Sequence, residues 1–281
     1  MNGQGPPRAR VVGDYLRLSR REVPAELIDA PPRLVGWCRD PSHLLDAAGG
    51  VRAGALLAMV DTLGGFLSGL AVLPRWIVTT NLALSQSQPG YDGPLVLDTT
   101  VLRRGRNSVV AAVDIGSAQE GATPFARATV TSSVLDPGEM TLDFARPVEV
   151  VVDDGGPRVP FDEFFPVWGA DPNATAMEVS EQLRNPWGIL HGGAVGALVD
   201  AAAARAASAH LGRQAVSVDA VVQFLSPVRV GPAEARATVL DGGGDHERAV
   251  VQIDIVDIGA GGRPTAWAVV TTAAVHATGG R

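Results

Sequence analysis

The chain has 281 residues and a formal net charge of −7, so it is long enough for two domains of about 140 residues, each with its own core. Basic residues are scattered rather than gathered in a stripe, which excludes nucleic acid as an expected partner. Cys38 is the single cysteine, which excludes a disulfide framework and cysteine-rich zinc sites and favours a reducing compartment.

The chain begins with MNGQGPPRAR, in which arginines are not followed by an apolar run. This pattern is typical of a disordered tail, which we predict over residues 1–12, and not of a signal peptide. We therefore expect a cytoplasmic protein.

The first long apolar segment, AGALLAMVDTLGGFLSGLAVL, covers residues 53–73 and carries one charge, Asp61. Its length would allow it to cross a membrane. Its glycines and its central Asp make a free-standing membrane helix unfavourable, however. We predict a helix enclosed by a sheet, and no membrane partner.

The segment has a counterpart later in the chain, which reveals an internal repeat. Asp61 in ALLAMVDTLGG corresponds to Asp200 in AVGALVDAAAA, 139 residues later, and Thr79 corresponds to Ser217, 138 residues later. An ordered series of matches with nearly constant spacing indicates a tandem duplication. Further pairs at similar spacing are Pro89 with Pro227, Gly93 with Gly231, Val113 with Ile253 and Pro124 with Pro264.

Repeat two has the clearer pattern of elements. We predict a short strand at ATAMEVSEQL, a turn at RNPWG, and a helix of small residues from about Gly192 to His210. Four runs with β-branched residues follow, at AVSVDAVVQFL, AEARATVL, ERAVVQIDIVDI and PTAWAVVTTAAV. The pattern predicts an α+β fold in which an antiparallel sheet curls around one central helix in each repeat.

The two repeats define the predicted domains. Repeat one covers residues 13–146 and repeat two covers residues 147–281. The joint lies near residues 135–160, where Pro, Gly and acidic residues replace the strand pattern.

The turn and helix of repeat two, NPWGILHGGAVGALVD, contain the candidate chemistry. Unpaired backbone N–H groups at a helix start, near Gly192 and Gly193, can polarise a carbonyl group of a substrate. A carboxylate such as Asp200 can activate water or attack directly. Asn185, with Ser217 and Thr79 on the matching strands, could orient the water or the substrate, and His191 is a further candidate catalytic residue.

Each of these residues also has a structural interpretation. His191 could cap the helix, the glycines could serve close packing, and Ser217 and Thr79 are ordinary strand residues. The aspartates are harder to explain structurally, because an Asp on an apolar helix face without a nearby cation is costly to bury.

The combination of Asn185, Gly188, the HGG at residues 191–193 and Asp200 resembles the motif of hotdog-fold acyl-CoA thioesterases of the phenylacetyl-CoA type. The strand VSVDAVVQFLSP is similar to the strand that follows this motif in that family. The resemblance implies tandem hotdog domains that form a pseudo-dimer within one chain, with the helices side by side and the sheets joined. It implies hydrolysis of an acyl-CoA thioester by an Asp-activated water. It implies no metal or redox cofactor, with CoA arriving as part of the substrate.

Repeat one departs from this motif at the turn, where Asp46, Arg52 and Ala53 stand at the positions of Asn185, His191 and Gly192. In the family, the helix start of one subunit faces the helix carboxylate of the other. If the repeats cross in this way, Asp61 and Thr79 complete the site at Asn185, His191 and Gly192, and the reciprocal site at Arg52 is weakened or dead. If each site lies within one repeat, Asp200 is the essential carboxylate instead. The sequence leaves both arrangements open.

The sequence also offers residues for binding CoA and for lining an acyl pocket. Arg104 and Arg106 could bind a CoA phosphate, or could belong to a solvated turn. Phe66, Trp187 and Phe224 could line an acyl pocket, or could be core residues. Relatives of this type often pair further, so we expect a homodimer of chains.

Two other functions stay open at this stage. A non-catalytic protein that binds acyl-CoA or lipid would explain why one helix start has lost its motif. A hotdog enoyl-CoA hydratase is another alternative, suggested by Asp40 and His43 near a helix start.

Overall fold

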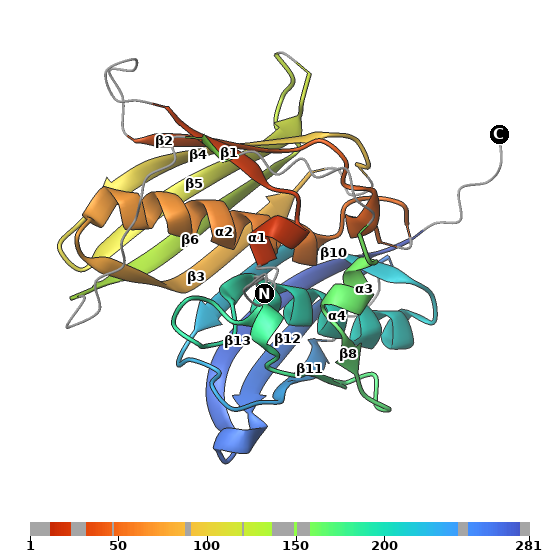
Figure 1. Ribbon diagram of the computed structural model, residues 1–281. Helices are drawn as coiled ribbons and strands as arrows, with labels where there is room; N and C mark the ends of the chain where they lie inside the picture. The colour runs from red at the N-terminus through yellow and green to blue at the C-terminus, as the bar shows by residue number, and fades with distance from the viewer. Residues whose placement is uncertain are drawn as a thin grey trace, which may run out of the picture.

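The computed structural model describes residues 12–23, 32–46, 48–87, 91–119, 121–136, 149–150, 158–240 and 247–275 (Figure 1). The tail predicted over residues 1–12 lies outside the described residues up to residue 11, and so do Pro89 and most of the predicted joint.

The elements of the first half are α1 (Val12–Tyr15), β1 (Ser19–Val23), β2 (Arg33–Cys38), α2 (Ala53–Val72), β3 (Trp76–Gln86), β4 (Leu95–Arg104), β5 (Ser108–Ser117) and β6 (Ala126–Leu135). Those of the second half are β7 (Glu149–Val150), α3 (Phe161–Phe164), β8 (Val167–Trp168), β9 (Ala174–Met177), α4 (Gly192–Leu211), β10 (Ala215–Phe224), β11 (Ala233–Leu240), β12 (Arg248–Asp257) and β13 (Arg263–Ala274).

The described strands form one antiparallel sheet of thirteen, in the order β7-β1-β2-β4-β5-β6-β3-β10-β13-β12-β11-β9-β8. β3 of the first repeat pairs with β10 of the second, with Leu84 opposite Ala220 and Leu82 opposite Val222. The two repeats therefore share a continuous sheet, and the predicted α+β architecture of two joined sheets is confirmed.

The strands form because apolar side chains alternate along them. In β4 the buried positions are Leu95, Leu97, Thr99 and Val101, while the residues between them are partly exposed. β5 follows the same period. Such alternation directs one face of each strand toward a core and the other toward water.

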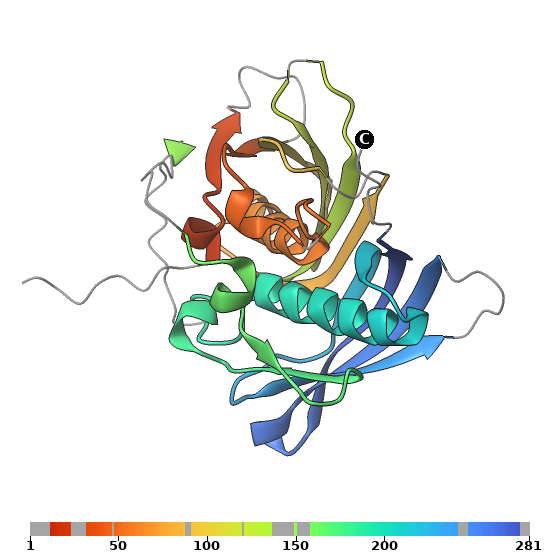
Figure 2. The same ribbon diagram turned by 90° about the vertical axis from the view of Figure 1, so that its right-hand side faces the viewer.

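The long helices α2 and α4 lie against the concave sides of the two halves of the sheet (Figure 2). Small residues let them approach closely: a Cβ on Gly193 would lie 2.7 Å from Ala58 Cα, and one on Gly196 would lie 2.8 Å from Leu57 Cβ. Gly193 of α4 contacts Ala58 of α2, and Gly196 contacts Leu57, so residue numbers rise along α4 as they fall along α2. The two helices are therefore antiparallel. This contact brings the start of α4 to the middle of α2.

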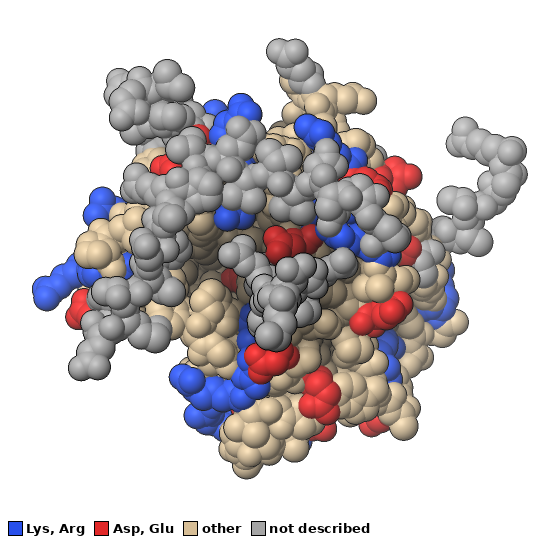
Figure 3. Space-filling model, viewed as in Figure 1, with Lys and Arg blue, Asp and Glu red and all other residues tan. Residues whose placement is uncertain are grey.

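Within the described residues, α2 is the helix that is long and apolar enough to span a membrane, and 67% of its most apolar window is buried inside the protein. It serves as the core helix of the first repeat. On the face shown in Figure 3, basic and acidic side chains are interspersed and form no continuous basic stripe.

Some local elements differ from the sequence prediction. The strand predicted at ATAMEVSEQL ends at Met177, because residues 181–183 form a 3₁₀ turn in which the Leu183 N–H bonds the Ser180 carbonyl at 3.0 Å. The strand β7 follows residue 146 but pairs with β1, with Arg20 opposite Val150. The chain thus adds a strand to the first half of the sheet before it enters α3, while the domain boundary at 146 stays a prediction.

Candidate active site

The turn before α4 is shaped by Asn185. Its side-chain Oδ1 accepts hydrogen bonds from the backbone N–H of Trp187 at 2.9 Å and of Ile189 at 3.3 Å. Gly188 has a φ of +70°, a conformation that favours glycine. This explains the spacing of Asn185 and Gly188 in the motif. Because its oxygen is engaged by the turn, the Asn185 side chain has its amide N–H groups left to donate.

His191 is the N-cap of α4, with extended backbone angles. Its backbone N–H donates to the Leu183 carbonyl at 2.8 Å, and its ring Nδ1 accepts from the Gly193 N–H at 3.0 Å. The capping role proposed from the sequence therefore exists. The imidazole also reaches a group from the other repeat.

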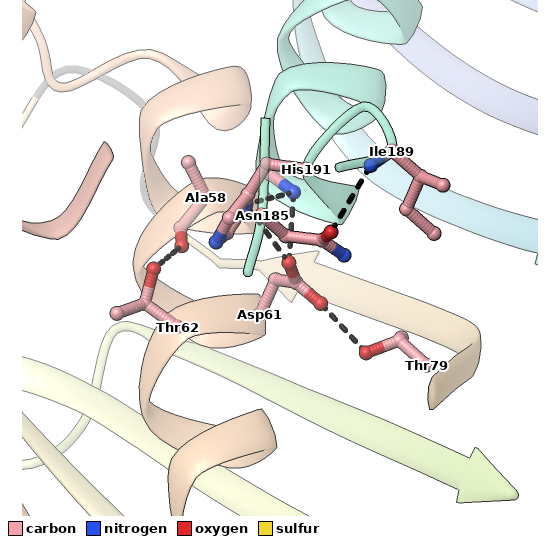
Figure 4. Close-up of polar contacts among 8 residues, drawn as sticks. Ala58, Asp61, Thr62, Thr79, Asn185, Ile189 and His191 are labelled. Atoms are coloured by element: carbon pink, nitrogen blue, oxygen red, sulfur yellow. Dashed lines mark hydrogen bonds and ion pairs between the residues drawn. The ribbon is translucent and has the colours of Figure 1, made fainter. Parts of the chain in front are cut away.

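That group is Asp61 of α2, which points toward His191 (Figure 4). The Asp61 residue is 7% exposed. Its Oδ2 accepts from the Gly193 N–H at 2.9 Å and lies 3.1 Å from His191 Nδ1. Its Oδ1 accepts from Thr79 Oγ1 at 2.8 Å. The structure thus brings Asp61 and Thr79 of repeat one to the helix start of repeat two, which is the crossed arrangement.

The Nδ1 atom of His191 can form either of two hydrogen bonds. With a hydrogen on Nδ1, the ring donates to Asp61 Oδ2. With Nδ1 bare, the ring accepts from the Gly193 N–H instead. The cluster can therefore rearrange its hydrogen bonds when a proton moves, without movement of the backbone.

The two glycines at the start of α4 have different roles. A Cβ on Gly192 would lie 2.7 Å from Asp61 Oδ2, so glycine is what allows the carboxylate to approach. The Gly193 N–H is taken by Asp61 and His191, so this group is not free to bind a substrate as the sequence suggested. Within the described residues, the Gly192 N–H has no hydrogen-bond acceptor, as expected for the first residue of a helix.

The structure places Asp200 and Ser217 in the reciprocal position, at the start of α2. A Cβ on Gly54 would lie 3.0 Å from Asp200 Oδ2. Burial raises the pKa of Asp200 above its usual range, and the Arg52 charge, Ser217 and the Gly54 N–H offset only part of that effect. Asp200 and Ser217 are therefore separate from the cluster formed by Asp61, Thr79 and His191. The sequence had suggested catalytic roles for residues of both groups.

Arg104 and Arg106 lie at the hairpin between β4 and β5. Arg104 of β4 lies opposite Val109 of β5, which lies opposite Ser132 of β6, which in turn lies opposite Thr79 of β3. Three strand spacings separate the two residues, about 14 Å. Both arginine side chains are exposed, so they lie beside the Asp61 site and not in it.

Sequence reasoning missed one feature of this site. The Trp187 ring meets the Trp76 ring edge to face, with centroids 4.1 Å apart, and so joins the turn before α4 to the start of β3. The signal was the position of Trp76, three residues before Thr79. Phe66 packs under the Arg20 guanidinium at 4.4 Å, while Phe224 is a partly buried residue against the core.

The residues that suggested a hydratase have other partners. Asp40 forms an ion pair with Arg17 at 2.8 Å. The His43 Nε2 lies 2.9 Å from the Tyr15 carbonyl oxygen, and its ring meets the Tyr15 ring edge to face. These contacts hold α1 in place. Among the described residues, no group of three His, Cys, Asp or Glu side chains is arranged to hold a metal.

Comparison with known proteins gives a family match and a fold. Residues 188–259 match the model of the thioesterase superfamily. A search of curated proteins gives no match. The acyl-CoA thioesterase II TesB2 from Mycobacterium marinum has a TM-score of 0.58 and 16% identity, covering 96% of this chain and 100% of that chain.

Two further structures show the same likeness. The TesB protein of Mycobacterium avium subspecies paratuberculosis has a TM-score of 0.56 and 14% identity, covering 86% of this chain and 92% of that chain. A hot dog fold protein from Alicyclobacillus acidocaldarius has a TM-score of 0.54 and 15% identity, covering 95% of this chain and 98% of that one. The fold of this chain is therefore the tandem hotdog, as the sequence predicted.

Proposed function

We propose that this protein hydrolyses acyl-CoA thioesters at the start of α4, with Asp61 as the group that activates water. The observation that carries the proposal is the hydrogen bond from Gly193 N–H of repeat two to Asp61 Oδ2 of repeat one. It places a buried carboxylate beside a helix start whose Gly192 N–H has no acceptor among the described residues. The thioesterase-superfamily match over residues 188–259 and the TesB-type fold support this proposal.

In the proposed reaction, the thioester carbonyl oxygen accepts a hydrogen bond from the Gly192 N–H. The positive end of the helix dipole stabilises the negative charge that develops on that oxygen. Asp61 removes a proton from water as the water oxygen attacks the carbonyl carbon. The C–S bond then breaks, the electron pair stays on sulfur, and the proton held by Asp61 passes to the thiolate. The products are a free acid and CoA.

The neighbouring side chains position Asp61 and the substrate. Thr79 holds Oδ1, so that the carboxylate presents a fixed orientation. His191 stabilises Oδ2 and can share the proton that Asp61 receives. The Asn185 amide is available to orient the thioester or the water. Asp200 and Ser217 take no part in this reaction.

The CoA portion would extend away from the site toward the β4–β5 hairpin, where Arg104 and Arg106 are available for its phosphates. Arg75 holds this hairpin, because its Nη1 donates to the Arg106 carbonyl at 2.8 Å. The homodimer of chains and the cytoplasmic location remain predictions from the sequence.

The experiment that tests the proposal is thiol release from a panel of acyl-CoAs by the wild type, Asp61→Asn and Asp200→Asn. Loss of general-base catalysis lowers a rate by about 10²–10⁴-fold, so we expect a fall of that size in kcat for Asp61→Asn only. Circular dichroism and the unfolding midpoint establish that all three variants fold alike. Loss of activity in Asp200→Asn alone would contradict the crossed site. A wild type that binds acyl-CoA but releases no thiol would identify a non-catalytic binding protein.

A further inference from the structure

The start of α2 keeps the backbone framework of the start of α4. Asp46 Oδ1 accepts from the N–H groups of Ala48 at 2.8 Å and Gly50 at 3.2 Å, as Asn185 does in its own turn. The Arg52 N–H donates to the Leu44 carbonyl at 3.1 Å, as His191 donates to Leu183. Repeat one therefore has a second helix start of the same backbone design, facing Asp200.

The side chain at that helix start points to a different partner. Arg52, which stands where His191 stands in repeat two, forms an ion pair with Asp162 of α3. Its guanidinium also lies 4.7 Å from the centroid of the Phe161 ring. The Arg52 side chain is 16% exposed although its partner Asp162 is 69% exposed, so the guanidinium itself is largely enclosed between the helix start and α3.

The helix α3 is held there by an aromatic cluster. Phe164 stacks on Tyr15 of α1, with centroids 3.7 Å apart and an interplanar angle of 7°. Phe165 packs against Phe161, Phe164 and Tyr15. Tyr15 also donates from its hydroxyl to the Val159 carbonyl at 3.1 Å. Since Phe161, Phe164 and Phe165 are all buried, α3 is part of the core and not a loosely attached loop.

The two helix starts differ in the side chains around the carboxylate and not in the burial of the carboxylate itself, since Asp61 and Asp200 are each 7% exposed. Thr79, beside Asp61, is partly exposed, whereas Ser217, beside Asp200, is 4% exposed. The His191 side chain contacts the carboxylate directly, with its Nδ1 3.1 Å from Asp61 Oδ2. Arg52 instead faces Asp162 and the Phe161 ring of α3, and its positive charge acts on the nearby Asp200 carboxyl.

We infer that α3 and Arg52 permanently occupy the start of α2 and exclude substrate from it. The chain then binds one acyl-CoA, at the start of α4, and the start of α2 serves as a structural contact between the repeats. The inference rests on the proposed function, because it takes the start of α4 as the substrate site. The inference adds that α3 lies where a substrate would bind at the start of α2. The contact between Arg52 and α3 ties the beginning of repeat two to the N-terminus of α2 in repeat one.

The first experiment counts binding sites on the full chain. A non-hydrolysable acyl-CoA analogue, with a methylene between sulfur and carbonyl, is titrated in a calorimeter. We expect one molecule bound per chain. Two sites of similar affinity would overturn the inference. If no analogue binds and no thiol is released, the proposed function fails instead, and the second experiment then decides the inference independently.

The second experiment measures how much the contact between Arg52 and Asp162 stabilises the folded protein. We compare the unfolding midpoints of Arg52→Gln, Asp162→Asn and the double variant, with Glu163→Gln as a control that removes one charge from the same short helix. We expect Arg52→Gln to lower the midpoint and Asp162→Asn to lower it by less, because the Asp162 carboxylate is 69% exposed. The double variant should fall no further than Arg52→Gln, and Glu163→Gln should have little effect. Where thiol release is measurable, kcat/KM should stay within about twofold, since none of these residues touches the Asp61 site. Additive effects, or an unchanged midpoint in Arg52→Gln, would overturn the inference.

Discussion

Gly192 is the residue on which the geometry of the site depends most directly. Its missing side chain lets Asp61 lie against the first turn of α4, since a Cβ there would be 2.7 Å from Asp61 Oδ2. Its N–H is also the proposed donor to the thioester carbonyl. A single methyl group at this position therefore affects both the carboxylate and the substrate.

We expect Gly192→Ala to lower kcat/KM by about 10–100-fold, because displacement of catalytic groups by about 1 Å has effects of this size. The measurement is thiol release under conditions where the unfolding midpoint shows that the variant is folded. A variant with wild-type kcat/KM would show that Asp61 need not approach the helix start.

Asp257 illustrates a different use of a buried carboxylate. It is fully buried at the end of β12 and accepts from the N–H groups of Arg229 at 2.8 Å, Val230 at 3.1 Å and Gly231 at 2.8 Å. Burial alone would raise the pKa of Asp257, but these hydrogen bonds outweigh burial and lower it. The carboxylate thus holds the loop that precedes β11.

Because its folded pKa is lowered, Asp257 stabilises the protein above the unfolded pKa of about 3.9 and loses that contribution as pH falls through the folded value. We expect Asp257→Asn to reduce the free energy of unfolding at pH 7 by about 1–3 kcal/mol. The difference between wild type and variant should shrink toward pH 3. Urea unfolding across this range measures it, and a difference that grows at low pH would contradict the assignment.

At the scale of elements, the sequence predicted the long helices and long strands well, because their apolar periodicity persists over ten or more residues. It missed α1 and α3, which have four residues each. A single helical turn has too little periodicity to detect, and these two are stabilised by contacts between Tyr15 and Phe164 that are distant in sequence. The strand β7 was missed for the same reason.

The contact between α2 and α4 gives a prediction about stability. Gly196→Ala would place a Cβ 2.8 Å from Leu57 Cβ, so we expect a loss of about 1–3 kcal/mol from overpacking. The matched change in the partner helix, Gly65→Ala, meets its nearest described neighbour at 4.0 Å. It should gain up to about 1 kcal/mol from helix propensity. Denaturant unfolding compares the two, and equal effects would contradict the close contact.

At the scale of the whole molecule, the two repeats share the pairing of β3 with β10 and the contact between their central helices. Neither half can open at this seam without exposing buried strands and breaking the Asp61 cluster. The site therefore exists only in the joined molecule.

We expect a single cooperative unfolding transition, with coincident curves from far-UV circular dichroism and tryptophan fluorescence in urea. Fluorescence reports on both halves, since Trp76 lies in repeat one and Trp187 in repeat two. Two separated transitions would show that the repeats are independent units.

The sequence by itself determined the duplication, the central helix and sheet of each repeat, and the residues of the helix start, because repeats, periodicity and motifs are local properties of a chain. Only the tertiary structure decided that Asp61, and not Asp200, faces His191, and that the Gly193 N–H serves the carboxylate. It also decided that Arg52 faces α3. These choices depend on how the two helices cross, and that crossing is set by packing between residues more than 130 positions apart.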